Sequence, residues 1–254
     1  MPFLKYDNVT IHYEEYGAGY PLLMFSGGSL NSSIEAWRTL TAFDPRVEYA
    51  NDFRMIALDI RNAGESWAPI TEQDGWHSYT ADHIALLDHL GIERCHVLGH
   101  CIGPSFSLAL MEAQPWRVSA AVHATPSGRY GPFKGRRPSF QNWVSTFKNH
   151  PEATETVLDQ FAANLYKRDF IPSTTREFVQ SCQTPMFVLP GIDQYHPTEI
   201  GEELARLAPN AECMKEWLRD PSQDIDGRHI ALPAAVTRIR EFLLKHTPPG
   251  QVRA

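Results

Sequence analysis

Short, predominantly apolar runs that alternate with helical segments constrain the fold of this chain more than any other feature. The runs occupy residues 21–25, 55–58, 95–98, 118–123 and 186–189. Runs of this length and apolarity are typical of strands buried on both faces of a parallel sheet. Apolar residues at helical spacing occupy residues 78–90, 105–113, 199–207 and 234–244. The alternation predicts an α/β fold, in which a mainly parallel sheet is covered by helices on both faces.

A single domain is expected for residues 1–254. The length of 254 residues lies within the range of one α/β domain, and no concentration of glycine and proline marks a linker. Residues 125–182 are aromatic, basic and helical in character, without clear strands, so we interpret them as a small helical cap inserted into the domain. The tail at 247–254 is expected to fray.

Composition and charge exclude several classes of protein. Apolar residues make up 43% of the chain and charged residues 21%, which fits a globular protein and argues against disorder. The apolar runs are too short to cross a bilayer, and the amino end lacks the pattern of a secretory signal, so a cytoplasmic location is expected. A net charge of -7 disfavours nucleic acid as a partner. Neither membrane nor nucleic acid is expected to bind, whereas a homo-oligomer is left open.

The four cysteines do not form a metal-binding or disulfide pattern. They lie at positions 95, 101, 182 and 213, with no C-x-x-C spacing, and are expected to be reduced thiols. No metal and no organic cofactor is predicted. We interpret Cys95, Cys182 and Cys213 as ordinary small apolar residues.

Cys101 differs from the other cysteines because of the residues around it. The segment Gly99-His100-Cys101-Ile102-Gly103 has the form G-x-C-x-G and joins a predicted strand to a predicted helix. A side chain on so tight a turn needs unusual backbone angles, and a Cβ at either glycine would collide with the neighbouring backbone. The amino end of the following helix favours a negative charge on the sulfur. The pattern predicts that Cys101 is a nucleophile.

This motif and its setting resemble the nucleophile elbow of the α/β-hydrolase superfamily, with cysteine in place of the usual serine. The resemblance extends over nearly the whole chain and implies an α/β-hydrolase fold with a catalytic triad. Ser26-Gly27-Gly28 stands where the family has its oxyanion loop, which implies that the backbone N–H groups of Gly28 and Ile102 are the oxyanion donors. Residues 59–66 resemble the family's D-x-R-G-x-G-x-S segment, with Asn62 where glycine is common.

The resemblance also implies the other two members of the triad. Residues 191–197 are similar to the family's acid-bearing segment G-x-x-D-x-x-x-P, with one residue fewer after the glycine, and Asp193 is the only carboxylate there. Residues 227–233 precede the final helical segment and look like the catalytic-histidine loop, which implies His229 as the base. In such a triad the imidazole takes the thiol proton, and the carboxylate orients the imidazole.

Other residues near these loops are assigned with less specific signals. The residues predicted to contact the substrate are Gly27, Trp37, His100 and Trp143. Aromatic residues near such a core more often serve packing. We interpret His196 and Asp226 as surface or supporting residues. The basic stretch at 129–137 could recognise an anionic substrate, but a solvated loop is the preferred interpretation.

The predicted function is hydrolysis of a small carboxylic ester, lactone or thioester through a covalent acyl-cysteine, without a cofactor. An acyltransferase that uses the same intermediate is the alternative. A non-catalytic receptor of this fold is a third interpretation, against which the complete triad argues. The sequence does not identify the substrate or its stereochemistry, nor whether Cys101 is native or replaces a serine.

Overall fold

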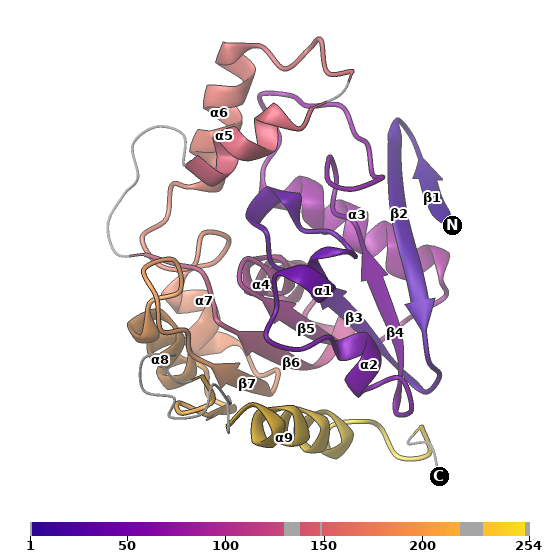
Figure 1. Ribbon diagram of the computed structural model, residues 1–254, viewed down its shortest axis with the longest axis vertical. Helices are drawn as coiled ribbons and strands as arrows, with labels where there is room; N and C mark the ends of the chain where they lie inside the picture. Colours follow the sequence, from indigo (N-terminus) through magenta and orange to yellow (C-terminus); the bar gives the residue numbers. More distant parts are fainter. Residues whose placement is uncertain (1, 130–137, 148, 219–230, 252–254) are drawn as a thin grey trace.

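An eight-stranded sheet forms the centre of the molecule in the computed structural model, which describes residues 2–129, 138–147, 149–218 and 231–251. The strand order is β1-β2-β4-β3-β5-β6-β7-β8 (Figure 1). The strands are β1 (Phe3–Tyr6), β2 (Val9–Tyr16), β3 (Tyr20–Phe25), β4 (Phe53–Leu58), β5 (Cys95–His100), β6 (Val118–Ala124), β7 (Met186–Leu189) and β8 (Ala211–Cys213). β2 pairs antiparallel with β1 and β4, and all other neighbouring strands are parallel. The predicted α/β fold with a mostly parallel sheet is confirmed.

Helices flank this sheet. The α-helices are α1 (Ala36–Thr39), α2 (Pro45–Glu48), α3 (Trp76–His89), α4 (Gly103–Ala113), α5 (Pro138–Ser145), α6 (Glu155–Leu165), α7 (Arg176–Ser181), α8 (Thr198–Leu207) and α9 (Ala231–Lys245). Two 3-10 turns, η1 (Ser29–Asn31) and η2 (Pro115–Arg117), complete the described elements. The edge strands β1 and β8 are not predicted from the sequence. Both are short and only partly buried, so neither contains the continuous apolar run of a central strand.

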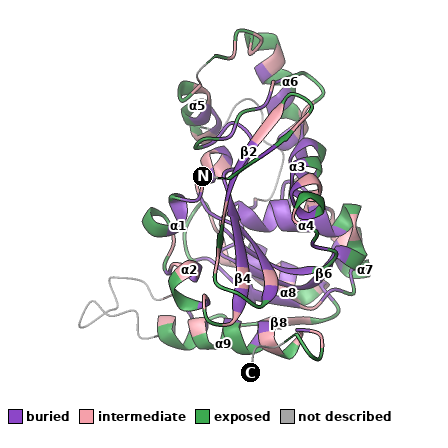
Figure 2. Ribbon diagram, turned by 90° about the vertical axis from the view of Figure 1, so that its right-hand side faces the viewer, coloured by how far each residue is buried: buried purple, intermediate pink, exposed green. Residues whose placement is uncertain are grey.

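Alternate residues of the central strands pack into two separate cores, one on each face of the sheet. In β3, Leu23 and Phe25 belong to the core that includes residues of α3, α4 and α8, whereas Leu22 and Met24 belong to the core that includes residues of α9. This alternation follows from the two-residue period of a strand, and burial on both faces explains why the strands are apolar throughout. Figure 2 shows the central strands largely buried and the exposed residues on the outer sides of the helices.

The described residues between β6 and β7 form the helices α5, α6 and α7. α5 and α6 lie at one end of the molecule and α9 at the opposite end (Figure 1). The indole Nε1 of Trp143 in α5 donates to the backbone oxygen of Asn62 at 2.8 Å. The side chain of Asn164 in α6 donates to the backbone oxygens of Glu72 and Asp74, each at 2.9 Å. These bonds fix α5 and α6 against the chain that follows β4.

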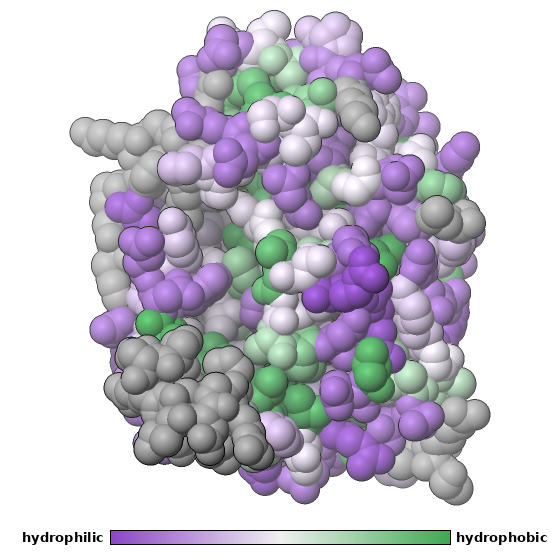
Figure 3. Space-filling view, viewed as in Figure 1, coloured by the Kyte–Doolittle hydropathy of each residue, from purple (hydrophilic) through white to green (hydrophobic). Residues whose placement is uncertain are grey.

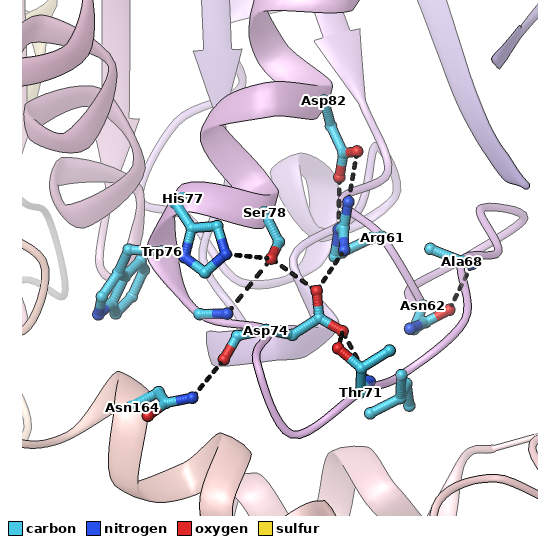
Figure 4. Close-up of polar contacts among 12 residues, drawn as sticks. Arg61, Asn62, Ala68, Thr71, Asp74, Trp76, His77, Ser78, Asp82 and Asn164 are labelled. Atoms are coloured by element: carbon cyan, nitrogen blue, oxygen red, sulfur yellow. Dashed lines mark hydrogen bonds and ion pairs between the residues drawn. The ribbon is translucent and has the colours of Figure 1, made fainter. Parts of the chain in front are cut away.

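A buried ion-pair network connects that same stretch of chain to α3. The guanidinium of Arg61 donates to both carboxylate oxygens of Asp82 at 2.7 Å and to Asp74 at 3.1 Å (Figure 4). Asp74 also accepts hydrogen bonds from Thr71 and Ser78. The side chain of Asp82 is 1% exposed, so its charge depends on these partners rather than on water.

Arg61→Met is expected to lower the free energy of unfolding by about 3–5 kcal/mol, because it leaves the buried Asp82 carboxylate without its charged partner. Urea unfolding of the variant measures the loss. Arg54→Met is the matched control, since its ion pair with Glu15 lies at the surface and is expected to contribute about 1 kcal/mol or less. Equal losses of unfolding free energy in the two variants would show that the Arg61 ion pairs contribute no more than a surface ion pair.

No helix within the described ranges combines the length and apolarity that crossing a membrane requires. On the face seen in Figure 3, hydrophobic residues form small groups separated by hydrophilic ones. The same described ranges contain no cluster of three histidine, cysteine, aspartate or glutamate side chains arranged to hold a metal ion.

Candidate active site

Cys101 lies on the sharp turn between β5 and α4. Its φ angle is 61°, in the left-handed region that residues other than glycine rarely adopt. A Cβ at Gly99 would lie 2.5 Å from the carbonyl carbon of Gly103, and a Cβ at Gly103 would lie 2.4 Å from the backbone oxygen of Phe25. The backbone N–H of Cys101 donates to the oxygen of Ala124 at 3.0 Å. The flanking glycines are therefore required by close backbone contacts, which is the geometry expected from the motif.

The loop between β7 and α8 brings an imidazole and a carboxylate to this turn. The imidazole of His196 lines the same cavity as Cys101, and its interaction with the sulfur lowers the pKa of the thiol. The Nε2 atom of His196 is buried and has no hydrogen-bond partner among the described residues. The Nδ1 atom of His196 lies 2.9 Å from Oδ2 of Asp193. Asp193 in turn accepts hydrogen bonds from the backbone N–H groups of Tyr195, at 2.7 Å, and of His196, at 3.0 Å. The imidazole is thus hydrogen bonded to the carboxylate and interacts electrostatically with the thiol.

The pKa values of these three groups shift in the directions that favour an ion pair. Burial would raise the pKa of the Cys101 thiol, but the interaction with His196 and its charge, with smaller contributions from Ser127 and the Gly28 backbone, lower it below its ordinary value. Burial would lower the pKa of His196, but Cys101 and Asp193 raise it to about 9. The pKa of Asp193 is lowered, because its hydrogen bonds outweigh the effect of burial. Both shifts favour a thiolate beside an imidazolium over a neutral thiol beside a neutral imidazole.

Backbone donors also surround the sulfur. The backbone N–H of Gly28 lies near enough to Cys101 to contribute to lowering the pKa of its thiol. Gly28 has a φ of 104°, which a residue with a side chain would adopt only under strain. Ile102, the residue after the nucleophile, precedes α4 and lines the same cavity as Gly28. The structure therefore places both residues predicted as oxyanion donors beside Cys101.

Cys101 lines a cavity of about 640 Å³, a size typical of small-molecule sites. Ser127 and Arg129, which follow β6, form part of the wall. Asn142 of α5 and Tyr166, at the end of α6, also line it. The wall therefore combines hydroxyl, amide and guanidinium groups, and the helical segment between β6 and β7 contributes to it.

The aromatic residues predicted to contact the substrate lie elsewhere. Trp37 is 1% exposed and Trp143 is 0% exposed, and neither is among the described residues that line the cavity beside Cys101. Trp37 packs in the core on the α9 face of the sheet, and the indole of Trp143 is engaged with the backbone oxygen of Asn62. The sequence cannot distinguish a tryptophan in a core from one that lines a pocket, because both environments are apolar.

Gly27 and His100 pack against each other next to the nucleophile. A Cβ at Gly27 would lie 3.0 Å from Nδ1 of His100 and 3.3 Å from the Cβ of Cys101. Burial lowers the pKa of His100 to about 3, so its ring is neutral at physiological pH. Neither residue is among the described residues of the cavity wall. Their contact instead supports the turn that holds Cys101.

His229 and Asp226 lie outside the described residues, so the prediction of His229 as the base stays a prediction. The structure instead brings His196 to the sulfur, a residue that the sequence analysis interpreted as a surface or supporting one. The sequence signal that could have found His196 is its position three residues after Asp193, because a turn of that length places the two side chains side by side. Gly191 permits the approach, since a Cβ there would lie 2.3 Å from the Cβ of His196.

The loop at 59–66 is held by the carboxylate of Asp59, which accepts a hydrogen bond from the backbone N–H of Glu65 at 2.9 Å. A Cβ at Gly64 would lie 2.3 Å from Oδ2 of Asp59, so the carboxylate occupies the space of a side chain. Asn62, which stands where the motif suggests glycine, has a φ of 60°. Asparagine tolerates this conformation, and its Oδ1 accepts a hydrogen bond from the N–H of Ala68 at 2.8 Å.

Comparison with known proteins identifies the family to which the chain belongs. The family described as the alpha/beta hydrolase fold matches residues 20–216. A candidate carbamate hydrolase, RutD, of Azorhizobium caulinodans is 32% identical over 122 residues, which cover 46% of this chain and 42% of the relative. The pimeloyl-[acyl-carrier protein] methyl ester esterase of Legionella pneumophila is 27% identical over 172 residues, which cover 67% of this chain and 58% of the relative. Both matches span less than two thirds of the relative's own length.

Among solved structures, the enol-lactonase from Burkholderia xenovorans resembles the chain with a TM-score of 0.67 at 17% sequence identity. The match covers 96% of this chain and 100% of the enol-lactonase chain. At this identity the likeness concerns the fold. Since the family match covers most of the sequence and agrees with the sheet order and the elbow, the chain belongs to the α/β-hydrolase fold family.

Proposed function

We propose that this protein is a hydrolase that cleaves a small carboxylic ester, lactone or thioester through a covalent acyl-cysteine at Cys101. One observation carries the proposal: the imidazole of His196 is hydrogen bonded to the carboxylate of Asp193 and lines the same cavity as the thiol of Cys101, whose pKa it lowers. The compared proteins are named as a carbamate hydrolase, a methyl ester esterase and an enol-lactonase. These names support hydrolysis of an acyl bond.

The first half of the proposed reaction forms a thioester. The thiolate of Cys101 attacks the substrate carbonyl carbon, and the backbone N–H groups of Gly28 and Ile102 stabilise the oxyanion, each contributing roughly 3 kcal/mol to lowering the barrier. When the tetrahedral intermediate collapses, the imidazolium of His196 gives its proton to the leaving oxygen or sulfur. The leaving group departs, and the acyl group remains on the sulfur.

The second half hydrolyses that thioester. His196, now neutral, takes a proton from a water molecule, whose oxygen attacks the thioester carbonyl. Collapse of the second intermediate releases the carboxylic acid and restores the thiolate–imidazolium pair. Asp193 remains ionised throughout, since its role is to hold the imidazole and stabilise its positive charge.

We assign the base to His196 because the described contacts connect it to both Cys101 and Asp193. The family resemblance favours His229 for this role. The two assignments predict different outcomes for variants at the two positions. We further propose that the chain is one domain and that residues 125–182 form a cap, since Asn142 and Tyr166 from this segment line the cavity.

Incubation with an activated aryl ester, followed by rapid acid quench and mass spectrometry, tests the covalent intermediate. The expected result is one acyl group on the peptide that contains Cys101 during turnover, because a thioester forms before water attacks it. Product analysis with and without an amine acceptor separates hydrolysis from transfer. A folded protein that shows neither an adduct at Cys101 nor turnover would argue for a receptor and against the proposal.

A further inference from the structure

Ser127 contacts the nucleophile, but the Cys–His–Asp series gives it no role. Its Oγ lies 3.4 Å from Sγ of Cys101. Its backbone N–H donates to the backbone oxygen of Cys101 at 2.8 Å. The side chain is partly exposed at the wall of the cavity. The hydroxyl of Ser127 therefore lies within hydrogen-bond range of the Cys101 sulfur, and the backbone of Ser127 is hydrogen bonded to the backbone of Cys101.

The chain after β6 is held at this position from both sides. The backbone N–H of Cys101 donates to the backbone oxygen of Ala124, the last residue of β6, at 3.0 Å. The N–H of Thr125 donates to the oxygen of Leu189 in β7 at 2.7 Å, with Thr125 at a φ of 45°. These bonds leave little freedom for the backbone of Ser127. Its hydroxyl group can turn toward the sulfur at little additional cost in conformational entropy.

We propose that Ser127 is a positioning residue, which donates its hydroxyl hydrogen to the sulfur of Cys101 and holds the nucleophile as a thiolate. This inference rests on the proposed function. A hydroxyl hydrogen bonds more strongly to an anionic sulfur than to a thiol or a thioester. Removal of the Ser127 hydroxyl should therefore destabilise the thiolate relative to the thiol, so that the thiolate forms at a higher pH.

Other groups around the sulfur limit the size of this effect. His196 contributes most to lowering the pKa of Cys101, and the backbone N–H of Gly28 is a further donor. Arg129, Tyr166 and Tyr195 line the same cavity, and the neutral ring of His100 lies next to the elbow. Ser127 is one of several stabilising groups. Its removal should therefore raise the midpoint pH of Cys101 alkylation by roughly one unit rather than abolish the thiolate.

The test is the pH dependence of Cys101 alkylation by iodoacetamide, quantified on the Cys101 peptide by mass spectrometry. A Cys213→Ser background removes the exposed thiol. We expect Ser127→Ala to move the midpoint of the rate profile up by roughly one pH unit and Ser127→Thr, which keeps a hydroxyl, to restore it. Ser139→Ala, which removes another hydroxyl from the cavity wall, should leave the midpoint unchanged.

An unchanged midpoint in folded Ser127→Ala would overturn the inference, as would equal shifts in Ser127→Ala and Ser139→Ala. A loss of turnover in Ser127→Ala without a shifted midpoint would show that the residue only shapes the cavity. Alkylation does not require turnover, so this readout remains valid even if no substrate is hydrolysed. Failure of the proposed function would appear separately, as turnover that persists in Cys101→Ala.

Discussion

Cys101→Ala is expected to abolish hydrolysis, with kcat reduced by about 10⁴-fold or more, because it removes the sulfur on which the acyl intermediate forms. Alanine keeps the Cβ atom and removes only the sulfur, so the elbow should fold as before. A panel of aryl esters, lactones and acyl thioesters identifies a substrate on which the loss is measured. Circular dichroism and urea unfolding check that the variant remains folded.

Cys213→Ala is the matched control for this result. It also removes a single thiol, but from an exposed position outside the cavity wall, and full activity is expected. If both Cys101→Ala and Cys213→Ala retained wild-type turnover, the chemistry would not depend on Cys101. That outcome would contradict the covalent mechanism and leave the fold assignment intact.

His196→Asn is expected to lower kcat by about 10²- to 10⁴-fold, the range typical of a lost general acid and base. Asparagine can still accept and donate hydrogen bonds near Asp193, but it neither carries the positive charge beside the thiolate nor delivers a proton to the leaving group. Steady-state kinetics on the substrate found with the ester and lactone panel measures the effect. KM should change less than kcat, because the lost interaction is made mainly in the transition state.

His229→Asn is the decisive companion to this variant. The assignment of the base to His196 predicts that His229→Asn keeps most of its activity. The opposite pattern, a large loss in His229→Asn and little change in His196→Asn, would show that the family position of the histidine holds in this chain. Asp193→Asn should be impaired under either assignment, since both histidines would depend on that carboxylate.

Much of the fold could be predicted from local sequence. The central strands are buried on both faces, so each appears as a short apolar run, and β5 with α4 frames the elbow as expected. The glycines at 99 and 103 are predictable because backbone contact leaves no room for a Cβ. The edge strands β1 and β8 are not predictable in the same way, since partial burial gives them no distinctive pattern.

The candidate site was predictable only where a motif fixes it. Cys101 and Asp193 stand in recognisable turns. The structure brings Cys101 and Gly28 to one cavity, and Asp193 is hydrogen bonded to His196 in the wall of that cavity. His196 was missed because its contact with the sulfur depends on how the loop after β7 folds back, which no sequence pattern specifies. Trp37 and Trp143 illustrate the reverse case, since their apolar character predicts burial without saying whether the surroundings are core or pocket.

The most direct test of the central claim is the pH dependence of Cys101 alkylation in the wild type, His196→Asn and His229→Asn. We expect a midpoint below the ordinary thiol pKa in the wild type and in His229→Asn, because His196, with a pKa of about 9, stays positively charged beside the sulfur at neutral pH. In His196→Asn the midpoint should rise by about one pH unit or more. A wild-type midpoint at the ordinary thiol value, or one that His196→Asn leaves unchanged, would show that His196 does not activate the Cys101 thiol.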